Sequence, residues 1–146
     1  MSDDQFILSG IVTLRNGEKM NEAKLEKQKK NLVEGGLMAP EDTLVDFLQA
    51  SYVDRLTKKL GTWKQGWAYF TQERLIVITG LLNNNIVIPY QTITELGKCS
   101  QGLFPMGIAI THRDAESGEI ITDKISLTKR EKWLEFLAGK AGVAMP

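Results

Sequence analysis

Residues 66–90, GWAYFTQERLIVITGLLNNNIVIPY, constrain the fold of this chain more than any other stretch. Residues 67–71 are almost all aromatic or β-branched, the side chains that fit a pleated, half-buried strand. Residues 75–79 run apolar without alternation, which predicts a strand covered on both faces. Residues 83–85 are all asparagine, which tolerates turn backbone, and Pro89 marks a strand end because it cannot donate to a ladder.

Two short motifs lie in this stretch, Thr71-Gln-Glu-Arg74-Leu75 and Ile88-Pro89-Tyr90-Gln-Thr-Ile93. In order and spacing they resemble the bacterial PH-like and GRAM-type domains, over residues 44–139. The resemblance implies a mainly β fold, a seven-stranded antiparallel barrel of two near-orthogonal sheets capped by a C-terminal helix. The predicted strands are residues 44–56, 62–71, 74–79, 86–88, 92–98, 107–112 and 119–126.

The first predicted strand and the N-terminal segment are ambiguous from pattern alone. Residues 44–56 repeat apolar side chains every fourth position, as a helix does, and also alternate as a strand does; the resemblance favours the strand. Residues 5–14 fit either type, and their Ile, Val and Thr content favours a strand, followed by a turn at residues 15–18.

Three segments are predicted along the chain. Residues 1–40 form an N-terminal extension with a helix at about 21–34, which the Gly35-Gly36 pair ends. Residues 41–140 form the PH-like domain, and residues 141–146 form a flexible tail.

A helix is predicted after the last strand. Thr128 and Glu131 have the spacing of a capping box, and Gly139 suits a helix end. Trp133, Phe136 and Leu137 make one apolar stripe, which is predicted to plug the barrel end.

Composition favours one ordinary globular domain in a cytoplasmic protein. The chain has 146 residues, with 18 basic and 18 acidic side chains that cancel, so no nucleic-acid partner is expected. Its single cysteine excludes a disulfide within the chain, and its start is acidic, unlike a signal peptide. The apolar residues 6–14 fall well short of the roughly 20 needed to cross a bilayer.

Catalytic chemistry finds no support in the sequence. His112 is the only histidine, so zinc sites built from several Cys or His ligands are excluded, and we expect it exposed in a hairpin. A pair of Cys99 with His112 is not excluded by sequence separation, but no neighbouring residue supports it. Asp114, Glu116 and Glu119 are expected to form a solvated turn. We therefore expect a non-enzyme with no cofactor and no metal.

Two binding surfaces are predicted. The resemblance implies a basic lipid-headgroup site at Lys58, Lys59 and Lys64, between the first two strands, although Gln65 and Trp67 stand where a further basic residue would help. The second surface is an apolar contact loop of Leu103, Phe104 and Met106 in the predicted loop 99–106, with Leu81 and Leu82 as similar residues in the asparagine-rich turn. These side chains either form an exposed patch or fold back under the barrel.

The expected function is a non-catalytic protein-interaction module in a bacterial cytoplasm, with an unknown protein partner or self-association. The alternative is peripheral binding to a membrane or to anionic lipid headgroups through Lys58, Lys59 and Lys64.

Overall fold

A computed structural model of the protein describes residues 9–53, 63–79 and 85–146, with side chains from residue 21 onward. The predicted site residues Lys58, Lys59, Leu81 and Leu82 lie outside the described residues. The chain divides into two compact units, Met1–Leu44 and Val45–Pro146.

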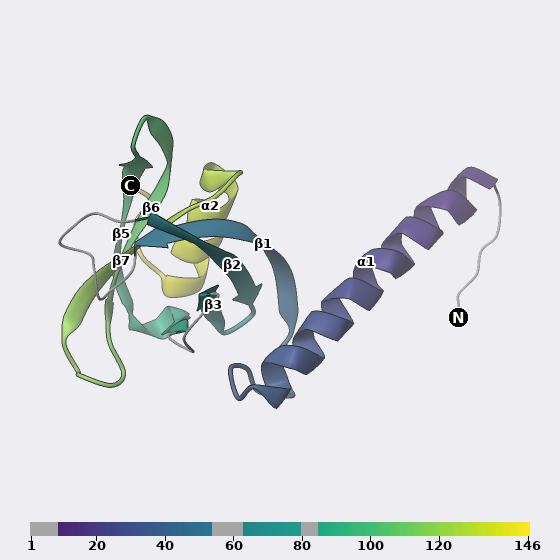
Figure 1. Cartoon of the computed structure of the whole chain (residues 1–146), viewed down its shortest axis with the longest axis horizontal. Helices are drawn as coiled ribbons and strands as arrows, with labels where there is room; N and C mark the ends of the chain where they lie inside the picture. Colours follow the sequence, from purple (N-terminus) through teal and green to yellow (C-terminus); the bar gives the residue numbers. More distant parts are fainter. Residues whose placement is uncertain (1–8, 54–62, 80–84) are drawn as a thin grey trace. The chain divides into compact units, whose positions relative to one another are not determined.

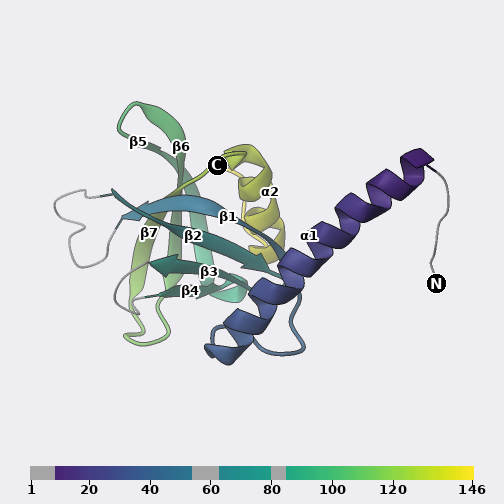
Figure 2. The same cartoon turned by 45° about the vertical axis from the view of Figure 1, so that its right-hand side comes forward.

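Seven antiparallel strands form one sheet in the order β4-β3-β2-β1-β7-β6-β5 (Figures 1 and 2). The strands are β1 (Leu44–Val53), β2 (Trp63–Thr71), β3 (Arg74–Thr79), β4 (Ile86–Pro89), β5 (Ile93–Gln101), β6 (Phe104–Arg113) and β7 (Ile120–Ser126). The predicted fold class is therefore confirmed, including the strand interpretation of β1. Hydrogen bonds link all seven strands into one sheet, which is not closed: it ends at β4 and β5.

Strand β3 is covered on both faces, as its unbroken apolar run predicts. Leu75, Ile76 and Val77 are all fully buried. Leu75 pairs with Phe70 of β2 and with Ile88 of β4, so the inner row of side chains continues across three strands. Burial of consecutive side chains, which point to opposite faces, explains why residues 75–77 show no alternation.

The two sequence motifs form one hydrogen-bonded unit. The hydroxyl oxygen of Thr71 accepts from the backbone N–H of Glu73 (3.1 Å) and of Arg74 (2.9 Å). The Tyr90 hydroxyl donates to the carbonyl oxygen of Thr71 (2.7 Å), and the Tyr90 N–H donates to the carbonyl of Glu73 (3.1 Å). Tyr90 opens the short 3₁₀ helix η2 (Tyr90–Thr92). The motifs therefore satisfy the buried polar groups of the β2–β3 turn.

The C-terminal helix α2 (Arg130–Ala141) begins and ends later than predicted. Lys129 is its N-cap, in left-handed backbone with φ of 58°, and makes no side-chain capping bond, so the capping box of Thr128 and Glu131 is wrong. Gly139 lies inside the helix. Gly142, with φ of 70°, is the C-cap, because it adopts the left-handed conformation that ends a helix.

Helix α2 closes the core of the second unit. The Trp133 ring stacks on Phe70 of β2, with centroids 3.9 Å apart and an interplanar angle of 8°. Phe136 meets Phe70 and Tyr90 edge to face, and Leu137 is fully buried. Trp133 and Phe136 are thus packed against β2 and η2, and Leu137 belongs to the buried core.

The N-terminal unit consists of helix α1 (Ser9–Glu34) and the segment that follows it. The strand interpretation is wrong for residues 9–14, and the turn predicted at residues 15–18 is also helical. A helix already nucleated by the good helix formers of residues 21–34 extends at little cost, because propagation is easier than nucleation. The helix ends before the glycine pair, and Gly36, with φ of 74°, supplies the left-handed residue.

Candidate functional site

The turn between β5 and β6 presents apolar side chains to solvent. Gln101 pairs with Phe104, so only Gly102 and Leu103 connect the strands. Gly102 has φ of 58°, and glycine at the first central position is typical of a type II′ hairpin. The second position, Leu103, points outward and is 98% exposed. A two-residue turn leaves this side chain no route back to the core.

Four consecutive nonpolar residues make up this end of the hairpin, and we name Leu103, Phe104, Pro105 and Met106 the apolar tip. Phe104 is 65% exposed, Pro105 is exposed and Met106 is half-buried. The predicted loop 99–106 is therefore mostly strand, and the alternative in which it folds back under the barrel is wrong. A run of three or four exposed apolar residues is unfavourable in a soluble domain unless it has a function.

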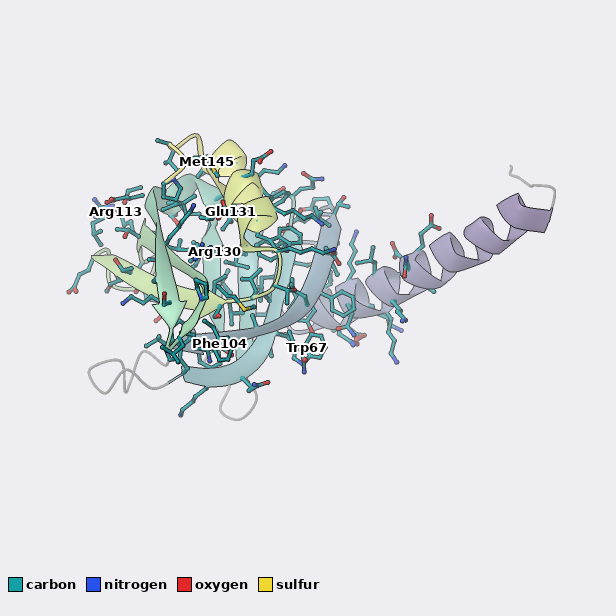
Figure 3. All side chains as sticks on the ribbon, turned by 90° about the horizontal axis from the view of Figure 1, so that it is seen from above. Trp67, Phe104, Arg113, Arg130, Glu131 and Met145 are labelled. Atoms are coloured by element: carbon teal, nitrogen blue, oxygen red, sulfur yellow. The ribbon has the colours of Figure 1, made fainter. Side chains whose placement is uncertain are left out.

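Helix α2 and its approach hold the base of this hairpin. The backbone N–H of Leu127 donates to the carbonyl of Met106 (3.2 Å), and the Arg130 guanidinium donates to the carbonyl of Cys99 (3.4 Å). Lys98 pairs with Glu131, with 3.1 Å between Nζ and Oε1. Figure 3 shows Arg130 and Glu131 at the start of α2, together with Phe104. The tip is therefore carried on an anchored hairpin.

Positive charge gathers beside Cys99. Burial raises the pKa of the Cys99 thiol, and the nearby cations of Lys124 and Arg130 partly offset that rise. Gly107 faces Cys99 closely, since a Cβ there would stand 2.5 Å from its sulfur. The sequence alone did not predict this basic surrounding, because its members come from β7 and α2.

The predicted lipid site is not assembled by the described residues. Lys64 lies exposed near the start of β2, whereas Lys58 and Lys59 fall outside the described part. The lipid-binding role of these three lysines remains a prediction.

His112 is buried, so the expectation of an exposed hairpin histidine is wrong. It is only 1% exposed, and its Nε2 lies 2.6 Å from Oδ2 of the buried Asp123. Its Nδ1 has no hydrogen-bond partner among the described residues. The alternation of Ile108, Ile110 and His112 places all three on the inner face of β6, and this period of two was the signal available in the sequence. No cluster of three or more metal-ligating side chains occurs among the residues described.

An aromatic row on the outer face of β1 and β2 was not predicted as a surface. Phe47 stacks on Tyr69 (centroids 5.6 Å apart) and contacts Trp67 (6.0 Å). Trp67 is 41% exposed, whereas Tyr69 is buried, and this burial raises the pKa of its phenol. The row alternates with the core residues Ala68 and Phe70.

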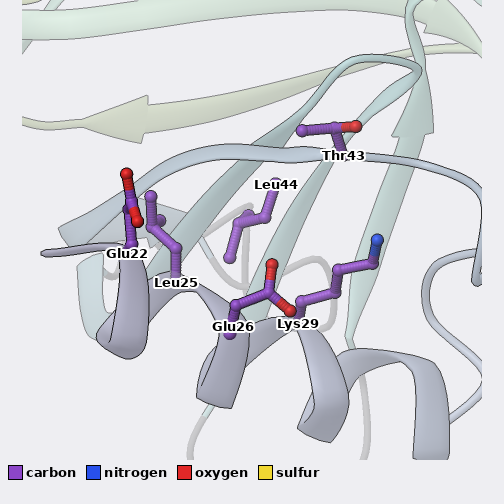
Figure 4. A pocket seen from close by; sticks show the side chains of 6 residues that line it. All are labelled: Glu22, Leu25, Glu26, Lys29, Thr43 and Leu44. Atoms are coloured by element: carbon purple, nitrogen blue, oxygen red, sulfur yellow. The ribbon is translucent and has the colours of Figure 1, made fainter. Parts of the chain in front are cut away.

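A pocket of about 320 Å³ lies within the N-terminal unit (Figure 4). Its lining residues are Glu22, Leu25, Glu26, Lys29, Thr43 and Leu44. The side chains of Glu22, Glu26 and Thr43 are exposed, so the pocket is an open surface hollow with mixed charge. Nothing in its geometry selects a ligand.

Comparisons with known proteins agree with this architecture. No protein family model matches the chain, and no curated protein matches its sequence. The C-terminal domain of an unknown protein from Leishmania infantum aligns with 80% of this chain and 95% of its own, at 17% identity and a TM-score of 0.56. The DH/PH domains of p115-RhoGEF align with 75% of this chain but 34% of their own, at 11% identity and a TM-score of 0.51.

A DUF1696 family protein with a pleckstrin-homology domain, from Shewanella loihica PV-4, aligns with 80% of this chain and 92% of its own, at 16% identity and a TM-score of 0.49. At these identities the likeness concerns the fold and not the ligand. The chain has a PH-like fold, and its function has to be argued from its own surfaces.

Proposed function

We propose that this chain is a non-catalytic binding module of the PH-like type that contacts another protein through the apolar tip. The observation that carries the proposal is the exposure of Leu103 and Phe104 on an anchored two-residue turn. Exposed apolar groups of this kind mark contact sites. The GRAM-type assignment and the bacterial setting belong to the same proposal and rest on the resemblance of the sequence motifs, and the cytoplasmic setting rests on composition.

The chemistry of the tip favours a protein over an anionic headgroup. Residues 99–107, CSQGLFPMG, contain no charged side chain, and of the cations beside this hairpin Lys98 and Arg130 are paired with Glu131. Burying one large apolar side chain is worth roughly 1.5–3 kcal/mol, so Leu103 and Phe104 together supply about 3–6 kcal/mol before the cost of association. This energy suits two apolar side chains that enter a pocket of a partner protein.

Lipid-headgroup binding through Lys58, Lys59 and Lys64 is the second candidate, supported by the exposed Lys64. No helix in the described ranges has a stretch long and apolar enough to cross a membrane. Co-sedimentation with vesicles that contain anionic lipid tests this candidate. Wild type should pellet at low salt and Lys58→Ala/Lys59→Ala/Lys64→Ala should not.

Photocrosslinking tests the proposed protein contact. A benzophenone amino acid replaces Leu103, and in a control protein it replaces Met145, which is also exposed. Each protein is incubated with an extract of its source cells and irradiated. A discrete protein adduct is expected from position 103 only, and it should disappear when Phe104 is also changed to Ser. Adducts to lipid alone, or equal adducts from both positions, contradict the proposal.

A further inference from the structure

Charge is segregated along strand β6. Basic residues lie on β5 and β7 beside the middle of β6 and at the start of α2, and we name Lys98, Lys124, Lys129 and Arg130 the basic shoulder. Glu131 pairs with Lys98 and Arg130. The turn at the other end of β6 carries Asp114, Glu116 and Glu119, which we name the acidic turn. Figure 1 shows the β5–β6 and β6–β7 hairpins at opposite ends of the sheet.

The two charged groups are too far apart to neutralise each other. Lys98 pairs in register with Ile108 and Lys124 with Ala109, in the middle of β6. These positions are five and four residues before Arg113, the end of β6 that leads into the acidic turn, so about 13–17 Å of strand separates them at roughly 3.3 Å per residue. Screening at physiological salt acts over about 8 Å. In Figure 3, Phe104 and Arg113, the first and last residues of β6, are well separated. The two charged groups therefore do not neutralise each other, and the side chains of Lys124, Lys129, Glu116 and Glu119 are exposed to solvent.

An exposed apolar side chain lies beside the acidic turn, and hydrogen bonds fix the backbone of the turn. Ile120, directly after it, is 48% exposed. The backbone N–H of Asp114 donates to the carbonyl of Glu119 (2.8 Å), and that of Gly118 donates to the carbonyl of Asp114 (2.8 Å). The Arg113 guanidinium donates to the Gly118 carbonyl (2.6 Å), which directs this cation into the turn. Both ends thus present exposed apolar side chains beside charge of opposite sign.

We propose that the partner of the apolar tip is a second copy of this chain, docked through its acidic turn and Ile120. This inference rests on the proposed function and names the partner of the same site. Opposite charges across an interface favour the correct partner and orientation. The net charge of zero removes long-range repulsion between copies. Each copy carries both surfaces of this contact, the apolar tip with its basic shoulder and the acidic turn with Ile120. Contacts between copies therefore continue head to tail or close in an antiparallel pair.

Sedimentation of the purified chain provides the first test. We expect the mean mass to rise with concentration at low salt. The association constant should fall at least about tenfold near 1 M salt, where screening shortens to about 3 Å. A plateau at two copies identifies the closed pair, and growth without a plateau identifies the head-to-tail chain; both support the contact. Leu103→Ser/Phe104→Ser should sediment as a monomer, and Met145→Ser should behave as wild type.

Reciprocal charge reversal supplies the decisive test. Lys124→Glu/Lys129→Glu reverses the basic shoulder, and Glu116→Lys/Glu119→Lys reverses the acidic turn. Each variant alone should be monomeric, because both of its ends carry charge of one sign. Their mixture should associate again, because each end then meets its opposite. Circular dichroism establishes that both variants are folded. Association of either variant alone at wild-type strength overturns the inference, as does a mixture that stays monomeric.

Failure here is distinguishable from failure of the proposed function. If the purified wild type is monomeric at every concentration while position 103 still crosslinks a different protein in extract, the second copy is the wrong partner and the protein-binding role stands. If position 103 forms no protein adduct in either setting, both proposals fail.

Discussion

Two turns of the same length, β2–β3 and β5–β6, are built in opposite ways. In the first, Thr71 and Tyr90 use side-chain oxygens to satisfy backbone groups, and both residues are buried. In the second, Gly102 supplies the backbone geometry by itself, and Leu103 and Phe104 remain exposed. The polar side chains at the first turn stabilise the fold, whereas the apolar side chains at the second turn remain available for contact with a partner.

Removing Trp133 should have the largest effect, because its ring stacks on Phe70 directly before the first turn. Trp133→Ala should lower the free energy of unfolding by roughly 3–5 kcal/mol. Urea denaturation followed by circular dichroism measures it. Trp67→Ala, at a tryptophan that is 41% exposed, should cost much less; equal losses would show that Trp133 does not anchor this region.

Breaking the buried pair of His112 and Asp123 should cause the second-largest loss in the free energy of unfolding. Asp123→Ala removes the carboxylate that lies 2.6 Å from His112 and leaves a buried ring nitrogen without it, for a loss of roughly 1–3 kcal/mol. Glu116→Ala, in the exposed turn, should change stability by less than about 0.5 kcal/mol. A double-mutant cycle with His112→Ala should give a clear coupling energy; independent losses would refute the pairing.

Tyr90→Phe should have a smaller effect and isolates the polar chemistry of the first turn. It deletes the hydroxyl that donates to the Thr71 carbonyl, and a loss of about 1 kcal/mol is expected. Thr122→Val is the matched control, because its hydroxyl lies 2.9 Å from that of Thr111 in an exposed pair. Comparable losses from both variants would remove the distinction between a buried and a surface hydrogen bond here.

The second turn should contribute least to stability. Leu103→Ser/Phe104→Ser should leave the free energy of unfolding within about 0.5 kcal/mol of wild type, since these side chains are exposed. The same variant should lose association at the tip. Unfolding curves and sedimentation on one sample measure both. A large loss of stability would place the tip in the fold rather than in recognition.

The strands were predictable from the sequence where side-chain type and burial agree. The aromatic and β-branched runs of β2 and β3 appear within a residue of their predicted positions. Residues 9–14 were not predictable in this way, since Ile, Val and Thr favour a strand while the neighbouring helix favours extension. The start of α2 was predicted wrongly because Lys129 adopts left-handed backbone, which a lysine side chain does not indicate.

The candidate site was predictable in composition but not in geometry. The sequence singled out Leu103, Phe104 and Met106, but only the Gln101–Phe104 pairing shows that the turn is too short to hide them. The basic shoulder depends on contacts between β5, β7 and α2, so sequence spacing does not reveal it. His112 was misplaced because its position next to Arg113 and Asp114 outweighed its alternation with Ile108 and Ile110.

The tight packing of Gly107 against Cys99 gives the molecule a built-in reporter. The chain has one cysteine, and burial raises the pKa of its thiol, so near neutral pH it is mostly protonated and slow to alkylate. Opening of the β5–β6 ladder would separate the sulfur from Gly107 and raise its exposure above the partial exposure of the folded state. Cys99 is half-buried, so it is the rise of the alkylation rate in mild denaturant that measures how often this hairpin opens, without any introduced label.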